Sequence, residues 1–361
     1  DTTAPTAQVT STTSAGSYAQ GDTVNITVTF DEAVTLGGTS PTLSAQLETG
    51  TTDRTVALTT ADSGLTWTGV YTVQAGDTSS DLTVNTLVLG GTSPTLTDVA
   101  GNTATLTIAA GVNLADNEAI VIDTTAPTAI VTTATAMNTA NAVVQSTEVG
   151  TAYIVKDSVT VIDEASITGA AGNEFNTVAI ATAATDTDLA LTGLIDGTYK
   201  VYTVDAAGNL SAASTNTVTV DTTAPTASAI VATDSEGSVT GALTSGDTTD
   251  DTALVLSGTN IAGSTVNVFD GDTLLGAADI VDTTWSYTVT IANGTSYSFT
   301  TKETDTAGNT SVASSAFAVT GDTTAPTASA IVATDDIGSV KEELTSGDTT
   351  DDTALVLSGT N

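Results

Sequence analysis

Residues 194–226 read LIDGTYKVYTVDAAGNLSAASTNTVTVDTTAPT, and this stretch decides the fold. It contains a turn, a tyrosine, an alternating apolar and polar segment, a Gly-Asn loop, a second apolar segment and a linker with one proline. A turn followed by a tyrosine at the start of strand F is the tyrosine-corner position of an immunoglobulin-like sandwich. Tyr199 lies six residues before Asp205, so the loop at residues 205–209 is predicted to connect strands F and G.

The linker and the loop both recur along the chain. The hexapeptide DTTAPT occurs at residues 1–6, 123–128, 221–226 and 322–327. The pattern Asp-x-Ala-Gly-Asn occurs at residues 98–102, 205–209 and 305–309. A period of roughly 100 residues is the size of one β-sandwich domain. The sequence therefore predicts four repeats: residues 1–122, 123–220 and 221–321, and the first part of a further repeat at residues 322–361.

The third and fourth repeats begin with almost the same sequence. Residues 221–260 and 322–361 differ at five positions of forty. The differing pairs are Ser235/Asp336, Glu236/Ile337, Thr240/Lys341, Gly241/Glu342 and Ala242/Glu343. Such similarity indicates a recent tandem duplication, and the natural protein is expected to continue with more copies of this unit.

Strand patterns fill the repeats, and no long helix is predicted. Several segments alternate apolar and polar residues, and Gly, Asn and Asp clusters separate them every 8–12 residues or so. The predicted strands are Val24–Phe30, Leu82–Leu89, Tyr199–Val204, Thr217–Val220, Ala253–Leu256, Val266–Phe269, Tyr287–Ile291 and Ala316–Val319. The predicted fold class is all-β, with tandem immunoglobulin-like Greek-key β-sandwiches arranged as an elongated rod.

The composition excludes several classes of function. Five Lys and Arg stand against 42 Asp and Glu, a formal net charge of −37, so the surface repels nucleic acid and anionic lipid. Without cysteine or histidine, the chain lacks disulfides, thiolate chemistry and the commonest general base. No apolar run approaches the ~20 residues that span a bilayer. We therefore expect no enzyme activity, no nucleic-acid partner and no membrane insertion.

In combination, these motifs resemble the bacterial Ig-like tandem repeats of large adhesins and surface proteins. The motifs are GDTVNITVTFDEAV and LTDVAGNTATL in the first repeat, GTYKVYTVDAAGNLSAAS in the second, and GDTTDDTALVLSGTN with VNVFDGDTLLG in the third. The resemblance covers essentially the whole chain. It implies an extracellular location on a bacterial surface, a role as a stalk, and calcium that stiffens the junctions between repeats.

The linkers and loops also allow a prediction of where calcium binds. In a seven-stranded sandwich, the N-terminus shares one pole with the B–C, D–E and F–G loops, so each linker aspartate is expected near the F–G loop of its own repeat. Ca²⁺ prefers carboxylate, amide and carbonyl oxygens. The predicted groups are Asp1 with Asp98 and Asn102, Asp123 with Asp205 and Asn209, and Asp221 with Asp305 and Asn309.

The preceding repeat is expected to contribute ligands from its opposite pole. Asp196 lies in a predicted E–F turn, and Asp247, Asp250 and Asp251 lie in a predicted A–B loop that is expected to face Asp322. A simpler interpretation remains open, because Asp and Asn in Gly-containing loops are ordinary turn formers. Other acidic residues, including Glu32, are interpreted as solvated charges.

Three functions compete on the sequence alone. The leading hypothesis is a spacer in which neighbouring repeats of one chain contact each other through calcium. The runner-up is a self-assembling extracellular fibre or surface-layer component, in which residues 322–361 complete another copy by strand addition. A carbohydrate- or ice-binding module is the third, but Trp67 and Trp285 fit a core role better than a sugar platform.

Overall fold

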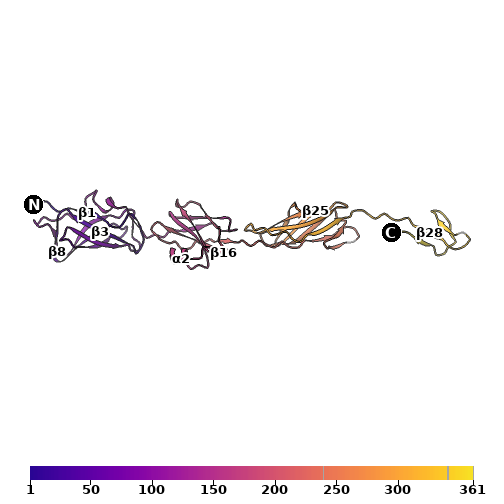
Figure 1. The fold of residues 1–361 in the computed structure, drawn as a ribbon, viewed down its shortest axis with the longest axis horizontal. Helices are drawn as coiled ribbons and strands as arrows, with labels where there is room; N and C mark the ends of the chain where they lie inside the picture. The colour runs from indigo at the N-terminus through magenta and orange to yellow at the C-terminus, as the bar shows by residue number, and fades with distance from the viewer. Residues whose placement is uncertain (239, 340, 361) are drawn as a thin grey trace. The chain divides into compact units, whose positions relative to one another are not determined.

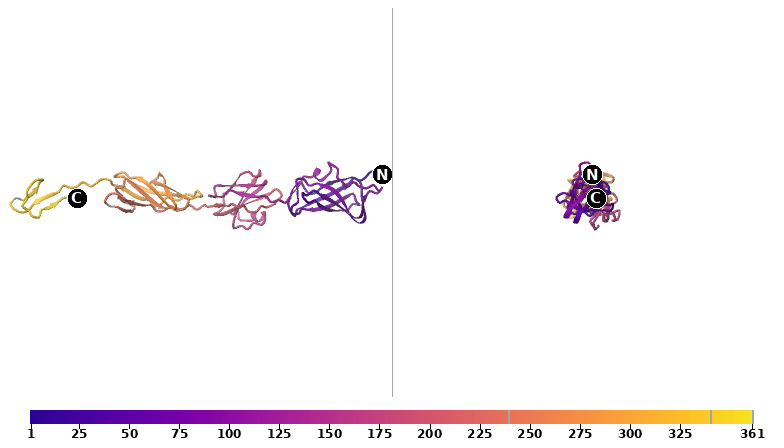
Figure 2. Two further views of the ribbon diagram at one scale, coloured as in Figure 1. Left: turned by 180° about the vertical axis from the view of Figure 1, so that it is seen from behind. Right: turned by 90° about the vertical axis from the view of Figure 1, so that its left-hand side faces the viewer.

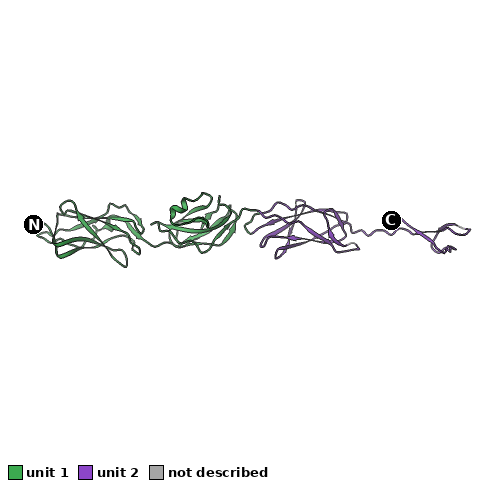
Figure 3. Cartoon of the chain, turned by 90° about the horizontal axis from the view of Figure 1, so that it is seen from below, with its two compact units in different colours: residues 1–223, 306–309 green, residues 224–305, 310–361 purple. Residues whose placement is uncertain are grey.

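The computed structural model describes residues 1–238, 240–339 and 341–360. Strands dominate, and the described residues contain two short helices, α1 (Leu114–Asn117) and α2 (Glu164–Thr168). No helix in these ranges is long and apolar enough to cross a membrane. The chain divides into two compact units, residues 1–223 with 306–309 and residues 224–305 with 310–361 (Figure 3).

The first repeat contains two sheets, and strands β1, β3 and β8 are labelled in Figure 1. The larger sheet has the order β1 (Ala7–Thr10), β3 (Thr23–Phe30), β6 (Thr66–Thr72), β5 (Arg54–Thr60), β4 (Thr35–Leu47), β8 (Val84–Thr97). The smaller sheet has the order β2 (Gly16–Tyr18), β9 (Ile120–Asp123), β7 (Thr78–Ser79). Strands β2 and β9 are parallel, whereas β7 and β9 are antiparallel.

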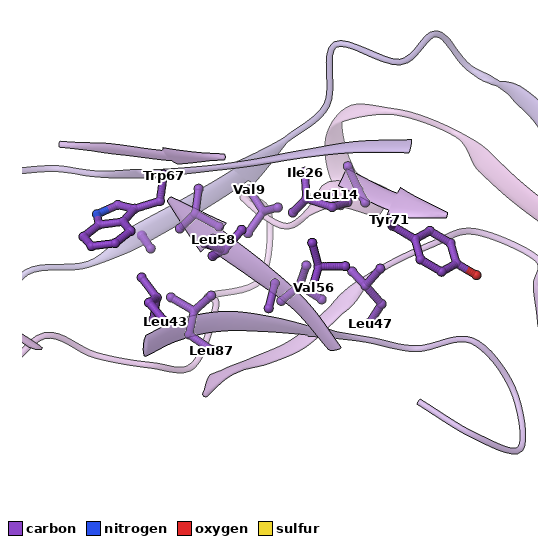
Figure 4. Close-up of a cluster of buried hydrophobic side chains, with 14 of the residues drawn as sticks. Val9, Ile26, Leu43, Leu47, Val56, Leu58, Trp67, Tyr71, Leu87 and Leu114 are labelled. Atoms are coloured by element: carbon purple, nitrogen blue, oxygen red, sulfur yellow. The ribbon is translucent and has the colours of Figure 1, made fainter. Parts of the chain in front are cut away.

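Alternating side chains fill the core of the first repeat (Figure 4). In β3, Val24, Ile26, Val28 and Phe30 point inward and are at most 1% exposed, as the period of two along a strand requires. Trp67 packs in the same cluster and is 6% exposed. The prediction that both tryptophans belong to cores is confirmed, because Trp285 in the third repeat is 1% exposed.

The second repeat has the strand order of an immunoglobulin-like sandwich. One sheet has the order β10 (Ala129–Val131), β12 (Asn141–Ser146), β15 (Thr187–Ala190). The other has the order β11 (Ala134–Ala136), β17 (Val218–Val220), β16 (Gly197–Asp205), β13 (Gly150–Lys156), β14 (Phe175–Ile180). At one edge of the larger sheet, β11 runs parallel to its neighbour β17, and the other neighbouring strands are antiparallel.

A second apolar cluster covers the outer face of that larger sheet. Tyr153, Val155 and Val204 point away from the main core and pack with Ile167 of α2. The helix begins at a capping box, in which the Asp163 carboxylate accepts from the Ser166 N–H. The second repeat therefore buries both faces of β13, which explains the run of buried residues in this strand.

The third repeat repeats the same architecture (orange in Figure 2). One sheet has the order β19 (Gly241–Leu243), β18 (Val231–Asp234), β21 (Ala253–Thr259), β25 (Thr284–Thr290), β24 (Asp279–Val281). The other has the order β20 (Asp247–Thr249), β27 (Phe317–Gly321), β26 (Ser296–Thr304), β22 (Thr265–Asp270), β23 (Thr273–Ala277). Strands β20 and β27 are parallel, as are β11 and β17 in the second repeat.

Residues 322–360 form one three-stranded antiparallel sheet. Its order is β29 (Glu342–Leu344), β28 (Val332–Asp335), β30 (Val356–Ser358). These strands lie 101 residues after β19, β18 and part of β21, so the near-identical sequence adopts the same pairing.

The protein is thus an all-β chain of tandem immunoglobulin-like sandwiches, as the sequence predicts. Each predicted strand falls within or overlaps an observed strand. The Tyr199 hydroxyl donates to the Ile195 carbonyl at 2.7 Å, which confirms the tyrosine corner. Tyr297 occupies the same place but accepts from the Ala292 N–H at 3.0 Å. Each sheet of the described residues lies within one predicted repeat, except that β9 extends by one residue, Asp123, into the second repeat. The exact repeat boundaries stay a prediction.

Candidate metal centres

The F–G loop of the second repeat is a closed turn around one carboxylate. Asp205 ends β16 and is 8% exposed. Its Oδ1 accepts from the Ala207 and Asn209 N–H groups at 2.8 and 2.9 Å, and its Oδ2 accepts from Asn209 Nδ2 at 2.9 Å. Gly208 has a φ of 92°, a conformation that favours glycine. Asp205 is therefore a turn-forming residue, and its hydrogen bonds hold the carboxylate in one position.

The first repeat builds the same loop from Asp98. The Asp98 oxygens accept from the Asn102 N–H at 2.8 Å and from Asn102 Nδ2 at 2.6 Å. Burial of Asp98 favours its protonated form, but these hydrogen bonds outweigh that effect and hold the pKa below its usual range. Asp98 is therefore ionised at neutral pH.

In the second and third repeats, the asparagine of the F–G loop holds the linker. Asn209 Nδ2 donates to the Asp123 carbonyl at 3.0 Å, and Asn309 Nδ2 donates to the Asp221 carbonyl at 3.0 Å. The predicted proximity of linker and F–G loop thus has a direct physical cause in both places. Asn209 and Asn309 act here as donors to the backbone, so their Nδ2 atoms are engaged with the chain itself.

Three carboxylates converge beside this contact in the second repeat. One oxygen from each of Asp123, Glu148 and Asp205 lies within 4.8 Å of the others. The pKa of Glu148 is raised by burial and by the negative charges of Asp123 and Asp205. Both ion pairs among the described residues lie elsewhere, at Arg54–Asp77 and Lys200–Asp157. The group therefore carries unbalanced negative charge.

An equivalent group occurs in the first repeat. Asp1, Glu32 and Asp98 also place one oxygen each within 4.8 Å of one another. The neighbouring Asp31 holds the linker, because its two oxygens accept from the Thr6 N–H at 2.9 Å and from the Thr6 hydroxyl at 2.8 Å. These bonds lower the pKa of Asp31. Glu32 thus lies in this group, whereas its sequence context predicts a solvated charge.

A third group lies in the A–B segment of the third repeat. Asp250 and Asp251 lie with Asp234 of their own repeat, with one oxygen of each within 4.8 Å of the others, and Asp322 is not part of this group. The Asp322 N–H donates to the Thr249 carbonyl at 2.9 Å, so the segment does lie beside Asp322. Asp251 is 1% exposed, because its oxygens accept from the Ser235 N–H at 3.1 and 3.3 Å. The group recurs 101 residues later as Asp335, Asp351 and Asp352.

The other predicted ligands are used as hydrogen-bond acceptors near the linkers. Asp196 Oδ1 accepts from the Thr222 N–H at 2.8 Å and Oδ2 from the Thr223 hydroxyl at 2.8 Å, which lowers its pKa. Asp247 accepts from the Thr244 N–H at 2.7 Å, and its pKa is lowered by this bond. Asp221 and Asp322 accept from the N–H two residues ahead. None of these four belongs to an acidic group found among the described residues. Asp305, the remaining predicted ligand, is partly exposed and belongs to none of these groups either.

The donor set suits a hard cation. Carboxylate oxygens that converge without a cationic side chain repel each other, and an oxygen-preferring ion such as Ca²⁺ relieves the repulsion. Soft metals prefer thiolate and imidazole ligands, and the chain has no cysteine and no histidine. The pKa of Glu148 is raised by burial and by the charges of Asp123 and Asp205. A cation bound beside Glu148 would offset both effects.

Comparison with known proteins finds two enzymes that match part of the chain. No family model matches the chain. Exoglucanase B of Cellulomonas fimi is 32% identical over 315 residues, which cover 81% of this chain and 26% of that enzyme. Chitinase A1 of Niallia circulans is 37% identical over 162 residues, which cover 44% of this chain and 22% of that enzyme. The chain thus spans about a quarter of the length of these curated relatives.

Comparison with solved structures also gives matches over most of the chain. The FN1–FN3 domains of chicken CNTN1 align with a TM-score of 0.31 at 9% identity, covering 88% of this chain and 99% of that one. Immunoglobulin domains 1–4 of Sidekick-1 align with a TM-score of 0.18 at 12% identity, covering 88% and 74%.

Proposed function

We propose that the chain is a non-enzymatic spacer of a large extracellular bacterial protein, of the adhesin or surface-protein type, stiffened by calcium near the linkers. The observation that carries this proposal is the cluster of Asp123, Glu148 and Asp205. Asp123 belongs to the linker, Glu148 to the B–C loop and Asp205 to the F–G loop, so one cation bound by all three would tie the linker to its repeat.

Hydrogen bonds already define much of the linker at this junction. Thr124 accepts from the Gly76 N–H at 3.1 Å and donates to the Asp77 carbonyl at 3.0 Å. Asp123 itself pairs with Thr78 of β7 in the first repeat, while its carbonyl accepts from Asn209 of the second. A cation at Asp123 would therefore act on a segment that contacts both repeats, which is where stiffness is determined.

Small-angle scattering tests the spacer directly. The whole chain is measured with saturating Ca²⁺ and again with excess chelator, at one ionic strength. We expect chelation to broaden the distribution of dimensions, because uncompensated carboxylates repel and release the linkers. A Mg²⁺ sample separates a specific calcium effect from charge screening. Identical profiles in all three conditions would mean that the acidic groups are only solvated turns.

A second candidate function is a self-assembling fibre, and one observation favours it. Leu355 and Leu357 in the sheet of residues 322–360 are 37% and 61% exposed. Their counterparts Leu254 and Leu256 are fully buried under the second sheet of the third repeat. If another copy adds a strand to this sheet, this apolar face is the surface that it would cover.

Sedimentation of the whole chain tests the fibre. If this face drives assembly, substituting Leu355 and Leu357 with aspartate should reduce the self-associated fraction at least tenfold, since both side chains point to the apolar face. Val356→Asp is the matched control, because Val356 points to the opposite face and is 62% exposed. A wild-type chain that remains monomeric at high concentration excludes this mode of assembly.

A further inference from the structure

A buried glutamate in the third repeat has no counterpart in the other two. Glu303 lies two residues before Asp305 on β26 and is 2% exposed. The residues two positions before Asp98 and Asp205 are Leu96 and Thr203, which are 0% and 1% exposed. The same core position thus holds an apolar residue, a neutral polar residue and a carboxylate in three successive repeats.

The hydrogen bonds of Glu303 satisfy one of its two oxygens. Oε1 accepts from the Ile261 N–H at 2.6 Å and from the Ser264 hydroxyl at 2.6 Å. Within the described part of the chain, no hydrogen bond reaches Oε2, and neither ion pair involves Glu303. Oε2 is not among the fully buried atoms without a partner, so an ion or water can reach it. Because burying a carboxylate without a charge partner costs free energy, a cation at Oε2 would offset that cost.

A second acceptor beside Glu303 is also unsatisfied. Asn260 is 8% exposed, and its Oδ1 is buried without a hydrogen-bond partner. Its Nδ2 donates to the Ile261 carbonyl at 2.8 Å and to Ser264 Oγ at 3.3 Å, so the amide orientation is fixed by these two acceptors. Ser264 Oγ contacts both Asn260 and Glu303, which places the two side chains in one group.

A third oxygen lies deeper on the same strand face. Thr301 precedes Glu303 by two residues, so both side chains point into the interior. Thr301 is 1% exposed, and its hydroxyl oxygen has no hydrogen-bond partner. The interior of the third repeat therefore holds a buried carboxylate and two orphaned neutral oxygens near its F–G end.

We propose that Glu303, Asn260 and Ser264 bind a hard cation inside the third repeat. A cation would neutralise the carboxylate and accept lone pairs from Glu303 and from the orphaned Asn260 oxygen at the same time. Carboxylate, amide and hydroxyl oxygens are ligands for Ca²⁺, and a single carboxylate also matches the charge of Na⁺. This site is independent of the linker clusters, since all three residues belong to the body of one sandwich.

The two tryptophans allow the site to be tested in the whole chain. Trp285 lies in the core of the third repeat, and Trp67, the other tryptophan, lies in the first. In a Trp67→Phe background, emission therefore reports on the third repeat. Thermal unfolding is followed in choline chloride with chelator, in NaCl, and in choline chloride with Ca²⁺, all at one ionic strength and neutral pH.

We expect one of the two ions to raise the unfolding midpoint by about 5 °C or more, as binding to the folded state alone requires. Glu303→Gln should abolish the shift, and Asn260→Asp should enlarge it by adding a second carboxylate. Asp250→Asn is the control for the separate acidic group of the third repeat, and the part of the shift that depends on Glu303 should persist in this variant. The proposal is overturned if neither ion raises the midpoint, or if Glu303→Gln keeps the full shift, since the buried oxygens then hold water or a proton.

Discussion

Replacing Glu148 with glutamine should weaken calcium binding at the second repeat by about 10- to 100-fold, because one full ligand charge is lost while the side-chain shape is kept. Glu148 is the suitable position, since no described hydrogen bond is accepted by its carboxylate. Asp205, by contrast, organises the F–G loop through three hydrogen bonds. The variant thus separates charge from loop structure.

Hydrogen exchange of β16 measures this effect within the second repeat, which lacks tryptophan. Saturating Ca²⁺ should slow exchange in the wild type, by an amount equivalent to about 2.7 kcal/mol at a hundredfold excess over the dissociation constant. Glu148→Gln should lose most of this protection at the same Ca²⁺ concentration. Asp188→Asn is the matched control, because Asp188 is exposed and lies outside the acidic groups. Equal protection in both variants would refute a metal site at Glu148.

The same residue gives a pH dependence with a definite sign. The pKa of Glu148 is raised in the folded state by burial, Asp123 and Asp205, so the folded chain binds this proton more tightly than the unfolded chain. Without calcium, the second repeat should therefore gain stability from this group as the pH falls through the raised pKa. Calcium requires the ionised form, so acid should weaken calcium binding. Glu148→Gln should remove the gain in stability and reduce the acid dependence of calcium binding, since Asp123 and Asp205 still titrate.

Replacing Arg54 with alanine should destabilise the first repeat clearly more than the loss of an exposed ion pair does, because it leaves the buried Asp77 carboxylate without its cationic partner. Arg54 contacts Asp77 Oδ1 at 2.7 Å, and the Tyr71 hydroxyl donates to Asp77 Oδ2 at 2.7 Å. Asp77 is 1% exposed. Burial opposes ionisation of Asp77, but the bonds from Arg54 and Tyr71 prevail and lower its pKa.

Trp67 emission in a Trp285→Phe background reports this loss during denaturant unfolding. Lys200→Ala is the control, because its ion pair with Asp157 is exposed and is expected to contribute at most about 1 kcal/mol. The lowered pKa of Asp77 stabilises the wild type above the unfolded pKa of about 3.9, and this contribution disappears as the pH falls through the folded pKa. Arg54→Ala should reduce that acid dependence. A loss no larger than that of Lys200→Ala would show that the network is not a structural anchor.

The sequence predicted the sandwiches because their signals are local. Tyr199, the Asp205–Asn209 loop and the alternation of β3 each occupy a few consecutive residues with one physical meaning. The linker and F–G loop were also correctly paired in space at Asp123 and Asn209, since topology alone places them at one pole.

The acidic groups could be predicted only in part. Glu32 and Glu148 come from B–C loops that carry no recurring motif, so nothing in the sequence marked them as neighbours of Asp98 and Asp205. The contact of Asp251 with Asp234 was not predicted, because it depends on the hydrogen bonds of Asp251 to Ser235, which no local motif indicates. Glu303 was missed because its burial follows from the face of β26 to which it belongs.

The duplication of residues 221–260 has a consequence for the order of folding. All five positions that differ from residues 322–361 are exposed in the third repeat, so every inward-facing residue is identical in the two copies. Residues 261–321 can therefore pack against residues 221–260 or against residues 322–361 with the same side-chain contacts. During synthesis, only residues 221–260 are available when residues 261–321 emerge, so the direction of translation selects the correct partner. Refolding from denaturant offers both segments at once, and a slow phase from misassembled sandwiches should then accompany the native phase.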